Sequence, residues 1–477
     1  MNVVPHKARA ETSAAKGGTD WPPSWNTLPD GISVGRYIDP AFQKLEYQKL
    51  WSRVWQIAAR VDEIPEPGDY TAYEIGDQAV IVVRVDEKTV KAYHNACPHR
   101  GTALAAGCGR FGRGRIICPF HGWRWDLSGR NQYILEQQEF HGGELRNNDV
   151  NLYELKVAVF AGFVFINFNE KPQPFDEFIA PIRPIMEILS IDLMRHYWWK
   201  SIPIPANWKV AQEAFFEAYH VPATHPQLEK AAAKFIFGDQ SAGEVAFSHR
   251  NVDYQAYPNG HGRFFAGKSV MTGTPQSGDA VPGQATDVDP VETMAARLSL
   301  LVEGMDAQVL QGDIDVLRTL RGKQLQPGSS LGGEYVKALY AAAAAEQRPM
   351  PKPVPEALGM WGGELFIFPN MMILPQGGNA MMYRVRPDGN NPDRCIFEIF
   401  STKSYPAAVQ PPRATVQRVT DLGDPAQVLL IPRQDLGNIP RIQKGLHASA
   451  MHRTWLASHH EKIILNMHEE LDRYLQA

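Results

Sequence analysis

Two short stretches of the chain each carry one cysteine and one histidine close together. Cys97 and His99 lie in the first stretch, Cys118 and His121 lie in the second, and eighteen residues separate His99 from Cys118. Two thiolates and two imidazoles are the ligands of a [2Fe–2S] cluster in which cysteines hold one iron and histidines hold the other. A proline follows each cysteine, which favours tight turns over helix. The pattern therefore predicts an electron-relaying cluster between two loops.

A structural zinc site is the alternative use of these ligands, because zinc also binds Cys and His at short spacings. Zinc sites usually pair two cysteines in one loop, whereas each loop here combines a cysteine with a histidine. The chain has only four cysteines, which leaves Cys108 and Cys395 as unpaired thiols, as expected in a reducing compartment. We therefore favour the iron–sulfur cluster and expect a cytoplasmic protein.

A second group of candidate metal ligands follows further along the chain. His220 and His225 come after Glu213 and Glu217 within residues 207–225. The apolar spacing predicts a helix that ends between the two histidines, with both glutamates and His220 on one face. Two histidines and one carboxylate form the ligand set of non-haem Fe(II) oxygenases, so a carboxylate must come from elsewhere. On their own, two histidines at a helix end are more often ordinary surface or core residues.

Together these stretches resemble the Rieske non-haem iron oxygenases, in particular the large (α) subunit of aromatic ring-hydroxylating dioxygenases and related monooxygenases. In that family the third iron ligand is an Asp on a long helix that continues to a Gln-x-Gly-Leu signature. Here Asp435 is followed by that signature at residues 443–446, with Pro440 between them, which predicts a kink. The resemblance implies one [2Fe–2S] cluster per chain and one Fe2+ held by His220, His225 and Asp435.

The same resemblance gives roles to two glutamates. Family members usually carry Asp three residues before the first iron-binding histidine, and this chain carries Glu217 there. In the family this carboxylate bridges the iron-site histidine, here His220, to a cluster histidine of a neighbouring subunit, here His121. Glu213 is expected on the metal side, as a hydrogen-bonding or electrostatic influence on the iron. The bridge implies a cyclic homo-oligomer, usually a trimer, with or without a small β subunit.

Composition excludes several other functions. The 477 residues carry a net charge of −4, which gives no basic surface for nucleic acid or an anionic membrane. No run of eighteen apolar residues occurs, so we expect no membrane span. The chain has no Gly-rich dinucleotide fingerprint and no flavin motif. We therefore expect electrons from a separate NAD(P)H-dependent reductase, with or without a ferredoxin.

The apolar pattern predicts an α+β fold. We expect a flexible arm over residues 1–35 and a helix over 36–56 that packs on the catalytic domain. A small antiparallel β domain over 57–170 holds the cluster. The catalytic domain, over 171–477, has a central antiparallel sheet flanked by helices. It contains an insertion at 227–357, which is either extra packing on the core or a lid over an apolar pocket.

The length of the chain favours an enzyme over an electron relay. A relay such as a ferredoxin-like protein needs neither the second ligand set nor the roughly 300 residues behind the cluster. We therefore expect an oxygenase component that uses O2 to hydroxylate, once or twice, or to demethylate an apolar, aromatic or polycyclic substrate. The alternatives are an electron-relay Rieske protein and a Rieske monooxygenase acting on a non-aromatic substrate such as a quaternary amine.

Overall fold

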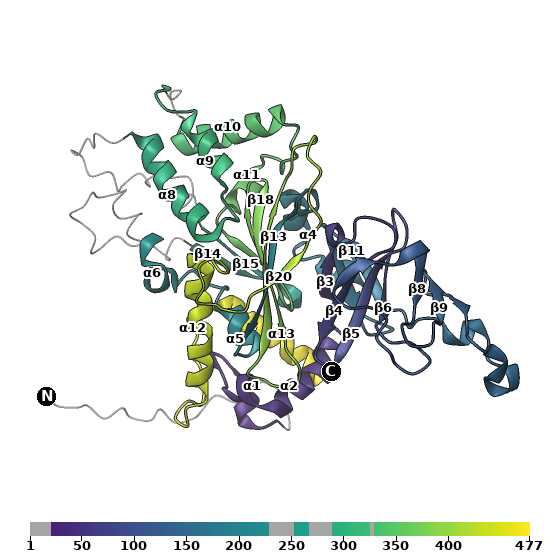
Figure 1. The fold of residues 1–477 in the computed structure, drawn as a ribbon. Helices are drawn as coiled ribbons and strands as arrows, with labels where there is room; N and C mark the ends of the chain where they lie inside the picture. Colours follow the sequence, from purple (N-terminus) through teal and green to yellow (C-terminus); the bar gives the residue numbers. More distant parts are fainter. Residues whose placement is uncertain (1–20, 229–251, 267–288, 325–328) are drawn as a thin grey trace.

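The α+β fold expected from the sequence is confirmed. The computed structural model describes residues 21–228, 252–266, 289–324 and 329–477. A large sheet surrounded by helices forms the bulk of the molecule, and a smaller β domain lies beside it (Figure 1). Within these described ranges, no helix is both long and apolar enough to cross a membrane.

The larger domain is built on one eight-stranded sheet with the order β14-β15-β16-β17-β18-β19-β13-β20. All neighbouring strands are antiparallel except β13 and β20. The strands are β13 (Arg195–Ile204), β14 (Val252–Ala256), β15 (Gly262–Ala266), β16 (Glu364–Ile367), β17 (Met371–Gln376), β18 (Asn379–Pro387), β19 (Cys395–Lys403) and β20 (Val416–Arg418). Most side chains of β16 to β19 are buried, so these strands form the core of the sheet.

The smaller domain consists of short antiparallel strands, as expected for the part that carries the two Cys/His loops. One sheet has the order β6-β5-β4-β7 and another has the order β10-β9-β8. Their strands are β4 (Asp69–Ile75), β5 (Gln78–Arg84), β6 (Val90–His94), β7 (Cys108–Arg110), β8 (Arg115–Ile117), β9 (Arg124–Asp126) and β10 (Asn131–Tyr133). A third sheet, β11-β12-β3, contains β3 (Gln56–Arg60), β11 (Lys156–Phe160) and β12 (Phe163–Asn167). The exact limits of the two domains stay a prediction.

Helices surround the large sheet. They are α1 (Gly35–Ile38), α2 (Pro40–Glu46), α3 (Phe175–Ile179), α4 (Arg183–Leu189), α5 (Trp208–Glu213), α6 (Val221–Thr224), α8 (Pro290–Met305), α9 (Gln311–Arg318), α10 (Leu331–Ala345), α11 (Pro355–Gly359), α12 (Leu430–Leu446) and α13 (Lys462–Gln476). Helices α8 to α10 lie within the expected insertion at 227–357, α11 begins in it and ends just beyond it, and these helices lie in the upper part of the view in Figure 1. Other parts of the insertion, at 229–251 and 267–288, lie outside the described residues.

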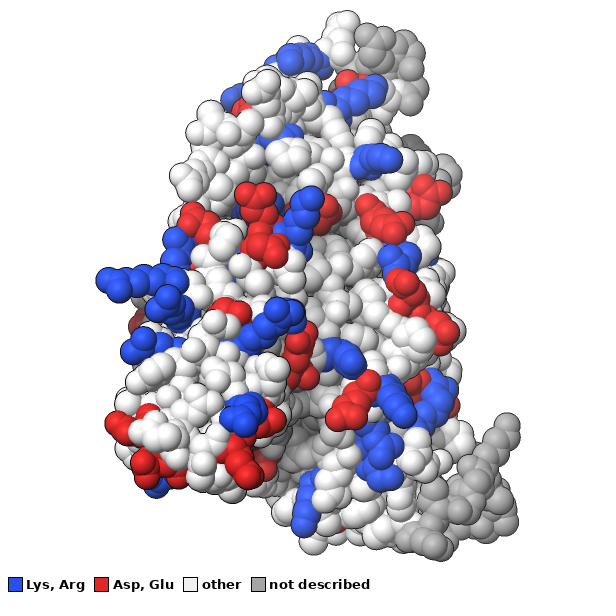
Figure 2. Space-filling view, turned by 90° about the vertical axis from the view of Figure 1, so that its right-hand side faces the viewer, with Lys and Arg blue, Asp and Glu red and all other residues white. Residues whose placement is uncertain are grey.

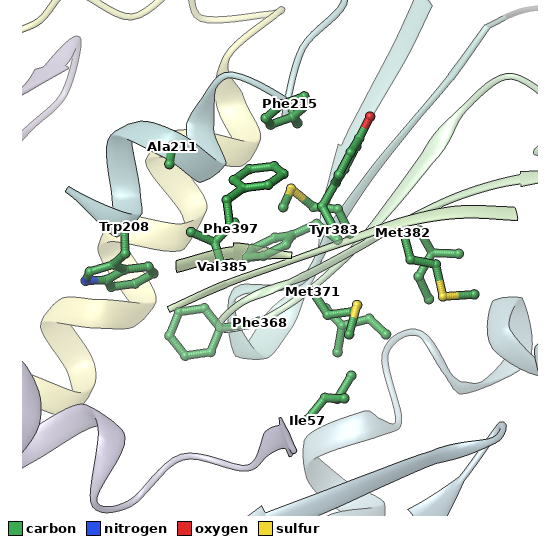
Figure 3. Packing of buried hydrophobic residues seen from close by; sticks show 14 of the residues in the cluster. Ile57, Trp208, Ala211, Phe215, Phe368, Met371, Met382, Tyr383, Val385 and Phe397 are labelled. Carbon is green, nitrogen blue, oxygen red and sulfur yellow. The ribbon is translucent and has the colours of Figure 1, made fainter. Parts of the chain in front are cut away.

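Helix α5 is fixed to the sheet by aromatic packing (Figure 3). Phe215, just beyond its end, lies 4.5 Å from Tyr383 and 5.2 Å from Phe397, measured between ring centroids. Trp208 at its start is fully buried and meets Trp51 edge to face. Burying each such ring contributes on the order of 2 kcal/mol, so packing holds α5 near both its start and its end.

The N-terminal region is more ordered than expected. Ile32 and Val34 are buried, and the backbone N–H of Ile32 donates to the hydroxyl of Thr454 near the other end of the chain. Residues 21–35 are therefore folded against the catalytic domain, contrary to the expected flexible arm, while residues 1–20 lie outside the described residues.

Charges of both signs are interspersed over the face turned to the viewer in Figure 2. Exposed side chains of opposite charge also pair with each other, for example Arg110 with Glu66 at 2.6 Å. Exposed pairs of this kind contribute little to stability. The surface in this view therefore offers no extended field of one sign.

Candidate metal centres

The two Cys/His loops have the same backbone design. In each loop the glycine four residues after the cysteine, Gly101 or Gly122, has a positive φ and donates its N–H to the carbonyl of Cys97 or Cys118. A left-handed residue at this position is easy only for glycine, so the loop can turn back sharply. The turn brings the cysteine and histidine of each loop to the same side.

The four side chains fit a [2Fe–2S] cluster. The Nδ1 atoms of His99 and His121 face each other at 3.2 Å, although the two residues lie on different loops. Cys97 and Cys118 are both buried, and burial together with the neighbouring thiol of Cys118 raises the pKa of Cys97. The histidines are only partly buried, so the cysteine side of the centre faces inward and the histidine side faces outward. Trp123 stacks on His99 with an interplanar angle of 10°, which fixes the ring.

The structure also brings His220, His225 and Asp435 together. One ligand atom from each residue lies within 4.8 Å of the other two. The Nε2 atom of His225 is 2.9 Å from Oδ1 of Asp435, and Nε2 of His220 is 3.7 Å from the same oxygen. Three ligands converging on one point, with two imidazoles and one carboxylate, fit a mononuclear iron site.

The predicted single helix over this region is wrong. Helix α5 ends at Glu213, residues 214–220 are not helical, and α6 starts at Val221. The break has local causes. The side chain of Glu217 accepts the backbone N–H of His220, and Pro222, in the first turn of α6, suits a helix start because proline lacks an N–H. The two histidines are therefore held by a turn and the end of a short helix.

Each iron-site histidine is oriented by a hydrogen bond to its other ring nitrogen. Nδ1 of His220 lies 2.9 Å from Oε1 of Glu217, and Nδ1 of His225 lies 2.9 Å from Oε1 of Gln434. Gln227 donates to the same oxygen of Gln434 at 2.8 Å. These bonds leave both Nε2 atoms free for a metal. Sequence reasoning missed Gln434, although it directly precedes Asp435.

Asp435 lies on α12, which also carries the expected Gln-x-Gly-Leu signature. The helix continues from Leu430 to Leu446 through Pro440, so the proline does not divide it. Gln443 is buried and accepts the backbone N–H of Asn207 at 3.0 Å. The signature therefore ties α12 to the start of α5, and this contact sets the carboxylate against the histidine segment.

Glu213 does not lie where the single helix would have placed it. Its carboxylate accepts from the hydroxyl of Tyr37 at 3.0 Å and pairs with Nε2 of His468 at 2.8 Å. Burial raises the pKa of Glu213 to about 8. Its observed partners are on the N-terminal and C-terminal helices, and among the described residues no hydrogen bond or ion pair joins it to the three candidate iron ligands.

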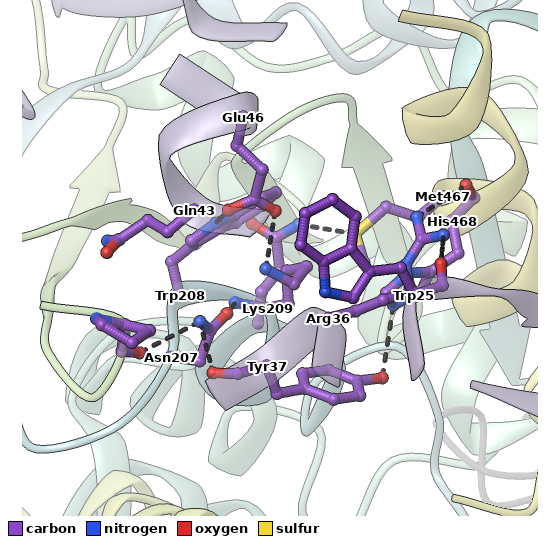
Figure 4. A network of polar contacts seen from close by, with 12 residues as sticks. Trp25, Arg36, Tyr37, Gln43, Glu46, Asn207, Trp208, Lys209, Met467 and His468 are labelled. Carbon is purple, nitrogen blue, oxygen red and sulfur yellow. Dashed lines mark hydrogen bonds and ion pairs between the residues drawn. The ribbon is translucent and has the colours of Figure 1, made fainter. Parts of the chain in front are cut away.

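A buried polar network anchors α5 to the N-terminal helices (Figure 4). Lys209 forms a 2.6 Å ion pair with Glu46 of α2, and both side chains are fully buried. The indole N–H of Trp208 donates to the same carboxylate at 3.1 Å. Asn207 caps α5 and donates to the carbonyl of Tyr37 at 2.8 Å. The N-terminal helices thus position the segment that carries the histidines.

A cavity of about 210 Å³ adjoins the three candidate iron ligands. Helix α8 forms one wall, which supports the expectation that part of the insertion encloses an apolar pocket. Its apolar lining residues are Phe215, Ala218, Val221, Leu228, Phe264, Met294, Leu298, Leu300, Leu301, Met305, Leu374 and Ile431. The charged side chains at the cavity, besides the ligands, are Glu217, Glu364 and Arg297. Such a space suits a small organic molecule.

Two family models match the chain and together cover most of it. The ring hydroxylating alpha subunit (catalytic domain) matches residues 191–477, and the Rieske [2Fe-2S] domain matches residues 54–153. The chain therefore belongs to the Rieske non-haem iron oxygenase family, as its sequence motifs indicate. Its cofactors are those of the family: one Rieske [2Fe–2S] cluster and one mononuclear iron.

Several relatives are named for quaternary amines. The glycine betaine monooxygenase oxygenase subunit of Pseudomonas aeruginosa is 30% identical over 195 residues, covering 41% of this chain and 44% of that protein. The carnitine monooxygenase oxygenase subunit of Acinetobacter pittii is 28% identical over 191 residues, covering 39% of this chain and 50% of that protein. The match thus spans about half the length of these relatives.

Solved structures confirm the fold. A quaternary ammonium Rieske monooxygenase in complex with L-carnitine has a TM-score of 0.61 and 14% identity, covering 96% of this chain and all of that one. Naphthalene 1,2-dioxygenase from Rhodococcus sp. bound to indole has a TM-score of 0.57 and 16% identity, covering 93% of this chain and 94% of that one. The same fold therefore occurs in proteins named for a quaternary amine and for an aromatic hydrocarbon.

Proposed function

We propose that this chain is the oxygenase component of a Rieske monooxygenase that oxidises a small quaternary ammonium compound. The observation that carries the proposal is the cavity, in which three convergent ligands meet apolar walls and further carboxylates. The names of the relatives support a quaternary amine as substrate. This is the alternative to the aromatic substrate expected from the sequence.

The proposed roles of the residues follow from their positions. Cys97, Cys118, His99 and His121 would hold the cluster. His220, His225 and Asp435 would hold Fe2+ on one side and leave coordination positions open toward the cavity. When bound, the cluster supplies electrons and the iron supplies O2 activation. The apolar walls would exclude water and hold the substrate against the open side.

The overall reaction balances with an external electron donor. One oxygen atom enters a C–H bond next to the nitrogen, and the other leaves as water after two electrons and two protons are supplied. Hydroxylation at a methyl group would release formaldehyde and a tertiary amine. A separate NAD(P)H-dependent reductase, with or without a ferredoxin, would provide the electrons.

The two centres of one chain are far apart. The strands β8 and β9 that flank the second Cys/His loop lie on the right side of the molecule in Figure 1, whereas α6 lies on its left side. A flat view cannot make two elements look further apart than they are, so the Cys/His loops and the iron-site histidines of one chain are widely separated. Direct electron transfer between the two centres of one chain is therefore unfavourable. We therefore propose a closed cyclic oligomer, a trimer, in which Glu217 meets His121 of a neighbouring subunit.

The test is substrate-dependent O2 consumption by the holoprotein with a surrogate reductase. Glycine betaine, choline and carnitine are compared with naphthalene, and products are identified by mass spectrometry. The predominantly apolar cavity favours an aromatic hydrocarbon as the second candidate. Product from naphthalene alone would support that candidate. Cluster reoxidation without any product would favour an electron relay.

A further inference from the structure

One carboxylate at the cavity has no role in the iron site. Glu364 begins β16, and its side chain is 2% exposed. Among the described residues, no hydrogen bond or ion pair to its carboxylate is present. Burial, and after it the charge of Glu217, raises the pKa of Glu364 well above its usual range. A buried carboxylate is costly without a partner, so a ligand is the natural candidate to supply one.

The neighbouring charges are already accounted for. Glu217 is engaged by His220, and Asp435 faces the two histidines. An Fe2+ ion held there would balance these two carboxylates, whereas the Glu364 carboxyl has no positive partner among the described side chains. Arg297 also lines the cavity, but no ion pair joins it to Glu364 in the described part of the chain. One cationic group of a ligand would therefore supply the positive partner that the Glu364 carboxyl lacks, and would stabilise its ionised form.

Aromatic rings surround the same space. Phe264 is directly opposite Glu364 in the antiparallel pair of β15 and β16, so both side chains lie on one face of the sheet. Tyr383 and Phe215 also line the cavity, with their ring centroids 4.5 Å apart. A quaternary ammonium group spreads its charge over methyl groups and donates no hydrogen bond. Aromatic faces beside one carboxylate match it better than they match a neutral or anionic ligand.

We propose that Glu364 is the specificity-determining residue of this cavity and recognises the cationic nitrogen of the substrate. The inference rests on the proposed function for the general class of substrate and assigns the recognition to one side chain. It implies that the protein rejects neutral molecules of the same shape. Specificity would then arise from a paired charge and not from cavity size alone.

Two matched pairs of probes test the proposal. Choline is compared with 3,3-dimethylbutan-1-ol, and glycine betaine with 3,3-dimethylbutanoate, because each pair differs by nitrogen against carbon. Binding to the anaerobic holoprotein is measured by isothermal titration calorimetry. For whichever cation the wild type binds, we expect Glu364→Gln to lower the affinity by roughly 30-fold, about 2 kcal/mol. The affinity for the matching carbon analogue should not change. Glu364→Asp, which keeps the charge, should retain part of the affinity.

Controls separate recognition from folding. Glu292→Gln removes a negative charge on α8 that pairs with Arg318 and Arg321 outside the cavity lining, and it should leave all affinities unchanged. Iron content and cluster absorbance are recorded for every variant. Equal losses for cation and analogue, no loss, or a wild-type protein that binds neither cation better than its analogue would overturn the inference. Selective binding without turnover of any quaternary amine would uphold Glu364 and reject the proposed function.

Discussion

The hydrogen bond between His225 and Gln434 gives a direct test of the iron site. Gln434→Leu keeps the approximate size of the side chain but removes the acceptor for Nδ1 of His225, 2.9 Å away. The ring loses the bond that fixes its tautomer and orientation, and a buried N–H is left unpaired because the His225 side chain is only 4% exposed. Losing such a bond typically lowers metal affinity by about 10- to 100-fold, or about 1.4 to 2.7 kcal/mol.

The assay is iron retention under competition with a chelator, with [2Fe–2S] absorbance as the internal reference. Gln434→Leu should lose mononuclear iron at a lower chelator concentration while cluster absorbance stays constant. Gln434→Glu keeps an acceptor for the His225 ring and should retain iron as the wild type does. Gln227→Ala removes only the residue that steadies Gln434 and should have a smaller effect. Unchanged retention in Gln434→Leu would refute the orienting role.

Three further predictions address the ligands, the bridge and the core. Asp435→Ala and, separately, His225→Ala should leave cluster absorbance intact but remove about one iron per chain and all product, as metal analysis would show. Glu217→Gln should keep both centres and the oligomer but slow cluster reoxidation by orders of magnitude in rapid mixing with substrate and O2; an unchanged rate would remove it from the path. Despite burial, Arg384 and Arg386 lower the pKa of Glu398 to about 2. Glu398 should therefore contribute about 3 kcal/mol to the free energy of unfolding above about pH 4.5, and this contribution should be lost as the pH falls toward 2. Urea unfolding of Glu398→Gln should lack this pH dependence.

The ligands were predictable from the sequence because metal chemistry restricts both residue type and spacing. The cluster ligands lie in two short loops, as Cys97 with His99 and Cys118 with His121. Their pattern can be recognised however the rest of the chain folds. Asp435 could be assigned as a ligand only through the resemblance to the family, because nothing in its local sequence distinguishes it from other acidic residues on a helix. The antiparallel strands were also readable, because they contain long apolar runs.

The structure of the segment that carries the first iron-site histidine was not predictable in the same way. Its apolar spacing fits a continuous helix as well as the observed break, because Phe215 and Phe216 are buried in either case. Packing on Tyr383 and Phe366, which lie far away in the sequence, decides where these rings go. Tertiary contacts therefore override the local preference, and the carboxylate of Glu213 pairs with Tyr37 and His468.

The cavity was beyond sequence reasoning for a related reason. In the sequence, Glu364 is only the first residue of an apolar strand. Its place at the cavity depends on the pairing of this strand with β15, which sets Glu364 opposite Phe264. The iron ligands are determined by chemistry that every member of the family must share. The residues that line the cavity come from several elements, among them α8, β15, β16 and β18, which only the fold brings together. A common catalytic centre can therefore serve different substrates when a few side chains that line the cavity differ, and Glu364 is one of those side chains here.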